Sequence, residues 1–429
     1  MEELKKKYDY DHKELLGSGT YGKVYSIKEI EGDKQFALKE MVKDFNNNKL
    51  TSYNKNKPTR EENERHKQQI SMRIVMELSI MRNNDINPHL ASIQDIYING
   101  DMKNILTLGV VMPMFKVSLK DVIYRPNNGL DYDTIKFFSA QLLSGLAALS
   151  NLDIMHRDIK PDNLMISEGN VLTIIDFGDA CCSSEENLHP QLNPGTIQYR
   201  SPEVLMGSVI YDESVDIWAA ACVIIEMFKG EEAFRATNYS ETYTRMKKLA
   251  PPDKRTLSAD IVNYARQSDD FKEQHNIFKE INPEYDASFT PLHLIDDDER
   301  RKQVEKWAGN ELNSLNYLLK RMLVIDKSNR QVTLILIQKK RFWGREYMTY
   351  KKMTKRDLRI KDFILVQKNT MDNIKYDQSE NMASFNKRVL REIVIPTINK
   401  ELKVSPADDD GDEYVDVNDF PYDESDEEP

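Results

Sequence analysis

The stretch His156-Arg157-Asp158-Ile159-Lys160-Pro161-Asp162-Asn163-Leu164, followed by Asp-Phe-Gly at 176–178, decides how this sequence is interpreted. A single Asp or Asn in a loop is more often a turn former than a functional residue. The two motifs therefore carry weight only through their order along the chain and through the motifs that surround them.

A glycine-rich stretch lies upstream, Gly17-Ser18-Gly19-Thr20-Tyr21-Gly22-Lys23-Val24. Its three glycines allow a backbone turn to lie against phosphates with no Cβ in the way. Taken alone, the pattern favours a plain hairpin turn. A dinucleotide-binding site would need a helix to begin at the glycines, whereas residues 24–27, Val-Tyr-Ser-Ile, continue as a strand and count against that class.

Lys39 and Glu77 form the next candidate pair. Lys39 follows Ala37-Leu38 inside an apolar strand, where a lysine is usually a surface residue with its ammonium in water. Glu77 lies on the apolar stripe of a helix predicted from recurrences at spacings of three and four, at Ile70, Ile74, Leu78 and Met81. A carboxylate on the buried face of a helix needs a partner, so we expect an ion pair that presents the Lys39 ammonium to the α- and β-phosphates of a nucleotide.

In this order the motifs resemble the signature set of the eukaryotic protein kinase family, in its serine/threonine branch. Ser201-Pro202-Glu203 completes the set in place of the usual Ala-Pro-Glu, and the resemblance covers roughly residues 12–345. It implies an α+β, bilobal fold with a small β-rich N-terminal lobe and a larger, mainly helical C-terminal lobe.

The resemblance also implies the chemistry, which is transfer of the γ-phosphate of Mg-ATP to serine and threonine hydroxyls of protein substrates. Such a transfer depends mainly on positioning and on charge neutralisation around a loose transition state. Asp158 would accept the proton of the substrate hydroxyl, and Lys160, two residues later as in Ser/Thr kinases, would neutralise charge on the γ-phosphate. Asn163 and Asp176 would hold Mg²⁺. The expected catalytic residues are Asp158, Lys160, Asn163, Lys39 and Glu77.

An adenine pocket is implied as well. Leu16, Val24 and Ala37 would form its roof, Met112 aligns with the gatekeeper, and Pro113-Met114-Phe115 aligns with the hinge between lobes. Proline fits at 113 because adenine needs a carbonyl acceptor there, while Phe115 would supply the donor N–H. The expected ATP-binding residues are Leu16, Gly17, Ser18, Gly19, Thr20, Tyr21, Gly22, Lys23, Val24, Ala37, Lys39, Met112, Pro113 and Phe115.

Three further stretches are similar to the group of cyclin-dependent, MAP and SR-protein kinases: residues 195–207, 214–228 and 247–253. By this resemblance Asp216 would anchor the backbone of the catalytic loop, and Arg330 would pair with Glu203.

The segment from Asp176 to Glu203 departs from that group, because residues 190–195 read Pro-Gln-Leu-Asn-Pro-Gly where related kinases carry a phosphorylated Thr or Tyr. We therefore expect activity that does not depend on phosphorylation at that position. In related kinases the arginine at the position of Arg157 contacts that phosphate. Here Ser183, Ser184 or the Glu185-Glu186 pair would substitute for the phosphorylated residue, or nothing would.

Substrate choice is a second departure. Proline-directed members accept a substrate proline through a backbone geometry near residues 194–195. Since Pro194 cannot adopt a positive φ, the sequence does not predict proline direction.

The remaining elements follow from periodicity and turn residues. Strands are predicted within 12–42 and 92–114, with turns at Glu31-Gly32-Asp33 and Asn99-Gly100-Asp101. Asp133 is expected to cap a helix whose apolar face is Phe138, Leu142, Leu146 and Leu149, and two more helices are predicted at 215–228 and 312–324. The expected division is a leader (1–11), an N-lobe (12–113) with a polar insertion (43–66), a C-lobe (114–345), an extension (346–404) and an acidic disordered tail (405–429).

Charge and composition exclude several classes of binding partner and of protein. The chain has 429 residues with 60 Lys+Arg against 71 Asp+Glu, and 12 of the acids lie in Ser405–Pro429, which has no Lys or Arg. The remainder, 60 against 59, has no basic field for coating nucleic acid. The start, MEELKKKYDYD, lacks the apolar core of a secretory signal, and the longest apolar stretches are too short to span a bilayer. Three cysteines form neither a disulfide framework nor a zinc-site spacing.

We therefore expect an intracellular protein, cytoplasmic and/or nuclear, with protein substrates and with neither nucleic-acid nor membrane partners. A regulatory partner could bind at the insertion 43–66 or at the acidic tail. The tail itself is either a solvated segment or an inhibitory or docking arm that touches the basic stretch Lys351–Lys361.

Two other functional classes fit the sequence less well. A kinase-shaped scaffold without catalysis would be expected to have lost Lys39, Asp158, Asn163 or Asp176, and all four are present. A small-molecule or lipid kinase is disfavoured because the 201–203 motif and the helix around Asp216 belong to enzymes with protein substrates.

Overall fold

The computed structural model describes residues 2–19, 22–42, 74, 76–82, 87–101, 104–125, 129–182, 195–205, 207–208, 211–235, 242, 246, 291–309, 312–324 and 330. The chain divides into two compact units. The described part of the first unit comes from residues 1–118 and 165–181, and that of the second from 119–164 and 182–358. The insertion 43–66, the extension and the acidic tail lie outside the described residues.

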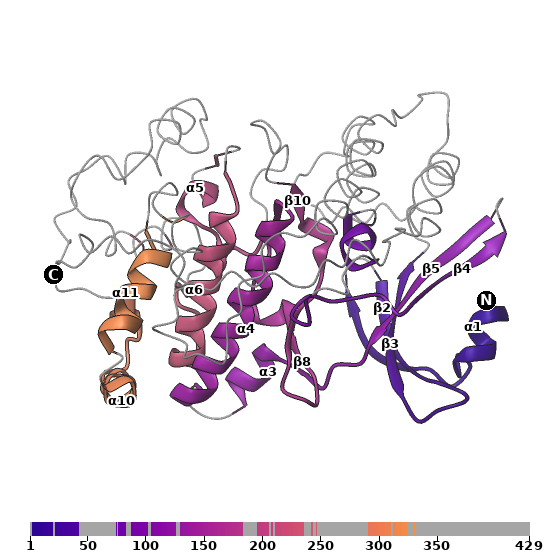
Figure 1. Ribbon diagram of the computed structural model, residues 1–429, viewed down its shortest axis with the longest axis horizontal. Helices are drawn as coiled ribbons and strands as arrows, with labels where there is room; N and C mark the ends of the chain where they lie inside the picture. The colour runs from indigo at the N-terminus through magenta and orange to yellow at the C-terminus, as the bar shows by residue number, and fades with distance from the viewer. Residues whose placement is uncertain are drawn as a thin grey trace, which may run out of the picture. The chain divides into compact units, whose positions relative to one another are not determined.

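The first unit is built on a five-stranded antiparallel sheet (Figure 1). Its strands are β1 (Glu14–Gly19), β2 (Gly22–Lys28), β3 (Gln35–Val42), β4 (Asp95–Asp101) and β5 (Asn104–Pro113). The spatial order is β1-β2-β3-β5-β4. An antiparallel sheet followed along the chain by helices confirms the α+β class.

The two faces of β3 differ because successive side chains point to opposite sides of a sheet. Ala37 and Lys39 lie on one face, which we call the inner face, and Phe36, Leu38 and Glu40 lie on the other, the outer face. The outer face carries an apolar cluster of Leu4, Tyr8, Ile27, Phe36, Leu38, Tyr97 and Val111.

The short helix α1 (Glu2–Lys7) supplies part of that cluster. Leu4 and Tyr8, four residues apart, are both buried, and the Tyr8 hydroxyl donates to Asp95 Oδ2 at 2.7 Å. Backbone bonds from Asp9 N to Lys28 O and from Ile30 N to Lys7 O add to the attachment. The segment interpreted as a leader is therefore packed against the sheet.

The turn predicted at Asn99-Gly100-Asp101 is wrong. These residues belong to β4, and Asp101 pairs with Asn104 of β5. The register shifts between Asn99 and Gly100, so the glycine marks a bulge, which is the other role that glycine commonly has in strands.

A second sheet of the first unit positions Asp176. It contains β6 (Val117–Ser118), β8 (Leu164–Ile166) and β9 (Leu172–Ile174) in the order β6-β8-β9. Ile174 exchanges backbone hydrogen bonds with His89 and Ala91, at 2.8 and 2.9 Å. The chain that leads into Asp176 is thus tied to residues 89–91.

The second unit is mainly helical. Its longer helices are α4 (Tyr132–Asn151), α6 (Ser214–Lys229), α10 (Asp298–Ala308) and α11 (Leu312–Met322). Shorter elements are α3 (Leu119–Tyr124), α5 (Pro202–Leu205), β7 (Ile154–Met155) and the 3₁₀ turns η1 (Pro161–Asn163), η3 (Ile197–Tyr199) and η6 (Pro291–Leu294). The turn η2 (Phe177–Asp179) belongs to the first unit, and β10 is Cys181–Cys182.

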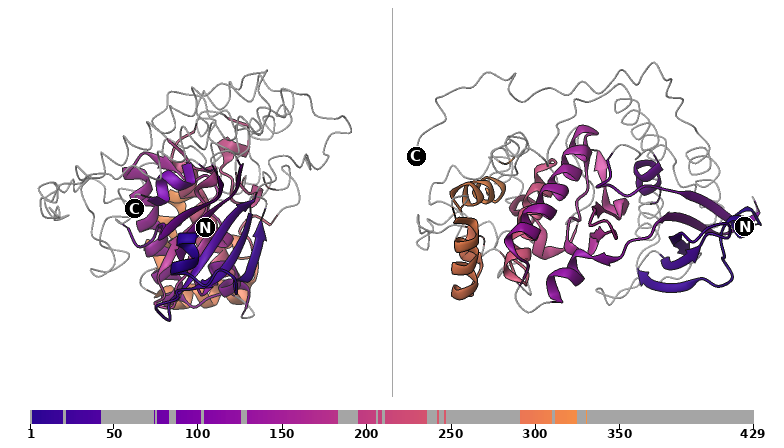
Figure 2. Two further views of the ribbon diagram at one scale, coloured as in Figure 1. Left: turned by 90° about the vertical axis from the view of Figure 1, so that its right-hand side faces the viewer. Right: turned by 60° about the horizontal axis from the view of Figure 1, so that its bottom comes forward.

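Helices α4 and α6 lie side by side (Figures 1 and 2), and every residue of α6 is buried. The predicted apolar face of α4, at Phe138, Leu142, Leu146 and Leu149, is buried. None of the helices in the described ranges is long and apolar enough to cross a membrane.

The cap predicted for α4 is wrong by two residues. Asp131 caps the helix, accepting from Thr134 N at 3.0 Å and from Thr134 Oγ1 at 2.6 Å, while Asp133 lies in the first turn. A capping side chain accepts a hydrogen bond from a backbone N–H two or three residues later in the chain, in the first turn of the helix. Asp131 is three residues before Thr134, whose N–H has no partner within the helix.

Candidate active site

Lys39 and Glu77 form the expected ion pair in the first unit. Lys39 Nζ lies 2.5 Å from Glu77 Oε1, and Glu77 belongs to a helical segment at 76–82. Burial alone would lower the pKa of Lys39, but the carboxylates of Glu77 and Asp176 outweigh it and raise the pKa. The ammonium is therefore held charged inside a water-poor environment, where its field on a phosphate is strong.

Asp176 completes this group of residues in the first unit. Its Oδ1 lies 4.0 Å from Lys39 Nζ, and 44% of its side chain is exposed. The residue adopts a left-handed backbone conformation, with φ +65°, while the next side chain, Phe177, is fully buried. The buried ring anchors the turn and leaves one carboxylate accessible beside the lysine.

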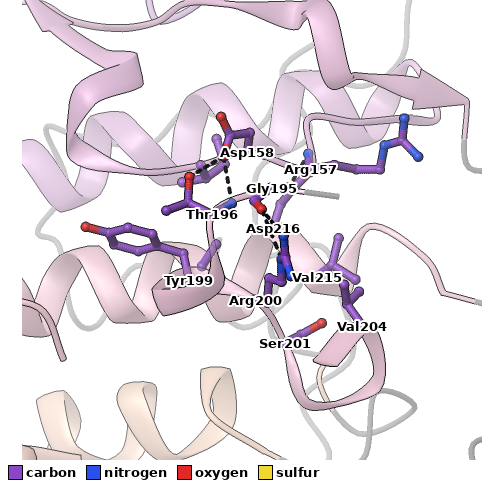
Figure 3. A pocket seen from close by; sticks show the side chains of 12 residues that line it. Arg157, Asp158, Gly195, Thr196, Tyr199, Arg200, Ser201, Val204, Val215 and Asp216 are labelled. Carbon is purple, nitrogen blue, oxygen red and sulfur yellow. Dashed lines mark hydrogen bonds between the residues drawn. The ribbon is translucent and has the colours of Figure 1, made fainter. Parts of the chain in front are cut away.

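Asp158 is the centre of a separate group of candidate residues, which lies in the second unit. Its Oδ2 accepts hydrogen bonds from Lys160 Nζ at 2.6 Å and from Asn163 Nδ2 at 3.0 Å. Its Oδ1 accepts from Thr196 N at 3.1 Å and from Thr196 Oγ1 at 3.0 Å (Figure 3). Lys160 Nζ also donates to Thr196 Oγ1 at 3.0 Å, so the four residues form one connected network.

Thr196 is a site residue that the sequence analysis did not assign. It lies inside the stretch 195–207 that was compared with the cyclin-dependent group, so the sequence signal was present. Its two hydrogen bonds hold Oδ1 of Asp158, while Lys160 and Asn163 hold Oδ2.

Asp216 supports this loop from below, as expected. Its carboxylate accepts from His156 N at 2.6 Å and from Arg157 N at 2.8 Å. Burial raises the pKa of Asp216, while these neighbours act against that rise. Arg157 has φ +67°, and its Nη1 donates to the Tyr211 hydroxyl at 3.0 Å. The strained loop conformation is therefore held by a buried carboxylate.

Gly195 lies directly above this loop. It has φ +75°, and a Cβ there would lie 2.3 Å from Arg157 O. Its carbonyl oxygen accepts from Arg200 Nε at 3.0 Å and from Arg200 Nη2 at 2.6 Å (Figure 3). Asp158, Gly195, Thr196 and Arg200 are among the residues that line a pocket in the second unit.

The expected pair of Arg330 and Glu203 is also present, with Nη2 donating to Oε2 and both side chains fully buried. It joins the end of the 201–203 motif to a residue more than 100 positions later.

The expected adenine-binding residues share the inner face of the sheet. In the strand register Val24 is opposite Lys39, and Ala37 is opposite Met112. Directly opposite residues of an antiparallel pair point to the same side. Leu16 is half-exposed, at 51%, and Pro113 ends β5 just before Phe115. Of the other predicted residues, Gly17, Ser18 and Gly19 lie in β1 and Gly22 and Lys23 in β2, whereas Thr20 and Tyr21 lie outside the described residues.

The residues present fit a nucleotide with a divalent cation. Asn163 Nδ2 donates to the backbone oxygen of Asp158 at 2.8 Å, which directs the amide, and its Oδ1 accepts no hydrogen bond within the described ranges. That oxygen in the second unit and, separately, the exposed carboxylate of Asp176 in the first unit are each hard donors of the kind that Mg²⁺ prefers.

Comparisons with known proteins agree with this geometry. A family model described as the protein kinase domain matches residues 10–343. The chain is 26% identical over 243 residues to a cyclin-dependent kinase 4 homolog of Caenorhabditis elegans, covering 56% of this chain and 54% of the relative. It is 28% identical over 244 residues to the probable serine/threonine-protein kinase yakA of Dictyostelium discoideum, covering 56% of this chain and 15% of that protein. The match thus spans about half the length of the first relative and a smaller share of the second.

Proposed function

We propose that this chain, which belongs to the protein kinase family, is a serine/threonine protein kinase that transfers the γ-phosphate of Mg-ATP to protein hydroxyls. Family membership implies ATP binding and a protein substrate. The observation that carries the proposal is the orientation of the Asp158 carboxylate by Lys160, Asn163 and Thr196.

Asp158 has the place of the group that receives the substrate proton. A carboxylate held by donors on both oxygens keeps one geometry, so it can orient an incoming hydroxyl and accept its proton as the oxygen attacks. Lys160 Nζ, 2.6 Å from Asp158 Oδ2, brings a positive charge to the point where the γ-phosphate and the hydroxyl would meet.

Lys39 has the corresponding role for the nucleotide. Its ammonium, held charged by Glu77 at 2.5 Å, would bind the α- and β-phosphates, and Asn163 and Asp176 would hold Mg²⁺. The bound cation would neutralise charge on the phosphates. The inner-face residues Val24, Ala37 and Met112 would contact adenine.

Serine and threonine are the proposed acceptors for two reasons. A lysine two residues after the catalytic aspartate is typical of Ser/Thr kinases, and Lys160 is in contact with both Asp158 and Thr196. In addition, one of the two relatives is named a serine/threonine-protein kinase and the other a cyclin-dependent kinase.

The test is transfer of labelled γ-phosphate from Mg-ATP to a mixed protein substrate. We expect Asp158→Asn to lower kcat by roughly 10²- to 10⁴-fold, because the amide cannot take up the substrate proton and its nitrogen cannot accept the hydrogen bonds that orient this side chain. Asp133→Asn, an exposed change in the first turn of α4, is the matched control and should behave as wild type. Phosphoamino-acid analysis of the product separates Ser/Thr from Tyr.

Two results would contradict the proposal. Undiminished transfer by the Asp158→Asn protein would exclude the assigned role of this residue. A wild-type protein that binds nucleotide and transfers nothing, in the presence of cell extract as a source of activators, would indicate a scaffold instead.

A further inference from the structure

On the outer face of the sheet, directly behind Lys39, four polar side chains converge: Tyr10, Lys13, Glu40 and Tyr97. We infer that this outer-face cluster positions Lys39 for the phosphates of the nucleotide. Tyr10 and Lys13, which come before β1 in the chain, then support nucleotide binding. The inference rests on the proposed function, since it assigns a supporting structure to the lysine of the same site.

Glu40 is the centre of the outer-face cluster. Its Oε1 accepts from the Tyr10 hydroxyl at 2.6 Å, from the Tyr97 hydroxyl at 2.6 Å and from Lys13 Nζ at 2.8 Å. Lys13 Nζ also donates to the Tyr10 hydroxyl at 2.8 Å. Three donors from two different parts of the chain therefore hold one carboxylate oxygen.

The charges of the cluster are compensated inside it. Burial would raise the pKa of Glu40, but the donors from Lys13 and the two tyrosines lower it overall. Lys13 Nζ lies 4.0 Å from the ring centroid of Tyr10 and 4.2 Å from that of Tyr25, so two aromatic faces receive the ammonium. Both ions thus stay charged with little contact with water.

A glycine gives Tyr97 its path to Glu40. In the sheet order, β5 lies between β4 and β3, and the register places Tyr97 opposite Gly109, which in turn is opposite Glu40. A Cβ on Gly109 would lie 1.8 Å from a carbon of the Tyr97 ring. The tyrosine can cross the middle strand only because residue 109 has no side chain.

The cluster acts on Lys39 through the backbone of β3. Lys39 and Glu40 are consecutive residues whose side chains point to opposite faces of the strand. Each face therefore carries an ion pair, Lys39 with Glu77 on the inner face and Glu40 with Lys13 on the outer face. A shift or rotation of the strand at residue 40 would move the Lys39 ammonium relative to Glu77.

Stability alone does not account for this arrangement. Replacing a buried ion pair with apolar side chains is often neutral or stabilising, so such a pair is weak evidence of stabilisation. The apolar cluster that contains Leu4, Tyr8 and Phe36 already attaches the N-terminal segment to the same face. Directional hydrogen bonds to Glu40 in addition fix the position of β3. A lysine on that strand that binds phosphate needs such a fixed position.

The test compares affinities for Mg-ATP and for adenosine, which lacks the phosphates that Lys39 would contact. Tyr10→Phe and Lys13→Met should weaken ATP binding five- to tenfold and adenosine binding by less than twofold. Tyr8→Phe is the matched control, because it removes a tyrosine hydroxyl from the same segment that bonds Asp95 and not Glu40. It should leave both affinities unchanged. Urea unfolding of each variant shows whether the fold is intact.

A double-mutant cycle supplies the decisive measurement. In a Lys39→Met background, the further change Tyr10→Phe should leave ATP affinity unchanged, because the group being positioned is already gone. Equal losses for ATP and adenosine, or a Tyr10→Phe effect that persists without Lys39, would overturn this inference while the proposed function stands. A wild-type protein that binds neither ligand would overturn both.

Discussion

Gly195 has a left-handed backbone conformation, which we expect to influence the residue that comes directly after the acceptor serine or threonine of a substrate. Its left-handed conformation turns its carbonyl oxygen towards Arg200, which donates two hydrogen bonds to it. In the kinase group that the sequence resembles, the substrate residue after the acceptor lies against this part of the chain. A residue with a backbone N–H would find that carbonyl already occupied, and proline has no N–H to satisfy.

We therefore expect a preference for proline directly after the acceptor serine. An unsatisfied buried donor costs about 1–3 kcal/mol, so kcat/KM for a Ser-Pro peptide should exceed that for its Ser-Ala counterpart by roughly 5- to 150-fold. Arg200→Met frees the Gly195 carbonyl and should reduce the ratio. Equal kcat/KM values for the two peptides with the wild-type protein would contradict the expectation.

The sequence alone did not predict proline direction, because Pro194 lies in the stretch where a positive φ is needed. Pro194 cannot adopt such a conformation, but the left-handed residue is Gly195. Glu77 shows the opposite outcome. A carboxylate on an apolar helical stripe needs a partner, and the only lysine in the preceding apolar strand is the one it contacts. Residue-scale prediction thus worked where burial demanded one partner, whereas the sequence did not show which of two neighbouring residues has the positive φ.

At the scale of elements, Glu226 of α6 connects this helix to two other parts of the second unit. Oε1 accepts from the Tyr124 hydroxyl of α3 at 2.9 Å, and Oε2 accepts from the Tyr199 hydroxyl of η3 at 2.7 Å. Burial raises the pKa of Glu226 to about 7, helped by the charges of Glu232 and Asp162 and opposed by the two tyrosine donors. The carboxyl group therefore takes up a proton near neutral pH in the folded protein.

This pKa makes stability depend on pH with a definite sign. Because the folded pKa lies above the value of 4.5 for an ordinary glutamate, the folded state binds more protons, and stability falls as pH rises from about 4.5 to about 7. Glu226→Gln should remove about 3 kcal/mol of that fall, as followed by urea unfolding at several pH values. Glu299→Gln, at an exposed position of α10, is the control and should keep the wild-type slope. An unchanged slope in Glu226→Gln would show that the carboxylate is not the group responsible.

Periodicity predicted most elements but not the ones that depend on tertiary contacts. Strands within 12–42 and the helices at 215–228 and 312–324 are long and patterned enough to be recognised. Helix α1 has only six residues, too few for periodicity, and it is held by Leu4 and Tyr8 against the sheet. The Asn-Gly pair at 99–100 is typical of a turn but is used as a bulge, because the two faces of β4 and β5 continue past it.

At the scale of the whole molecule, the order of the motifs along the chain was sufficient to indicate the family. The residues that support Lys39 from the outer face could not be recognised from the sequence. The signature motifs are local and were recognised one by one. The outer-face cluster joins residues 10, 13, 40 and 97, which share no motif, and it depends on the absence of a side chain at Gly109. The alternation of side chains along β3 predicts only that Glu40 points to the opposite face of the sheet from Lys39. Contacts of this kind appear only once strand order and register are known.

Charge is the whole-molecule property with a testable effect on substrate binding. The last 25 residues hold 12 acids and no base, against 60 basic and 59 acidic residues in the rest of the chain. Long-range attraction between this tail and a basic protein substrate is screened over about 8 Å at physiological salt. We expect deletion of 405–429 to leave the KM for ATP unchanged, because the residues proposed to bind ATP lie between 16 and 176. The same deletion should remove most of the salt dependence of KM for a basic substrate. A neutral substrate is the control and should show no change. If deletion instead lowered KM for basic and neutral substrates alike at low salt, the tail would be an inhibitory arm that covers the substrate site, and charge attraction would not be its role.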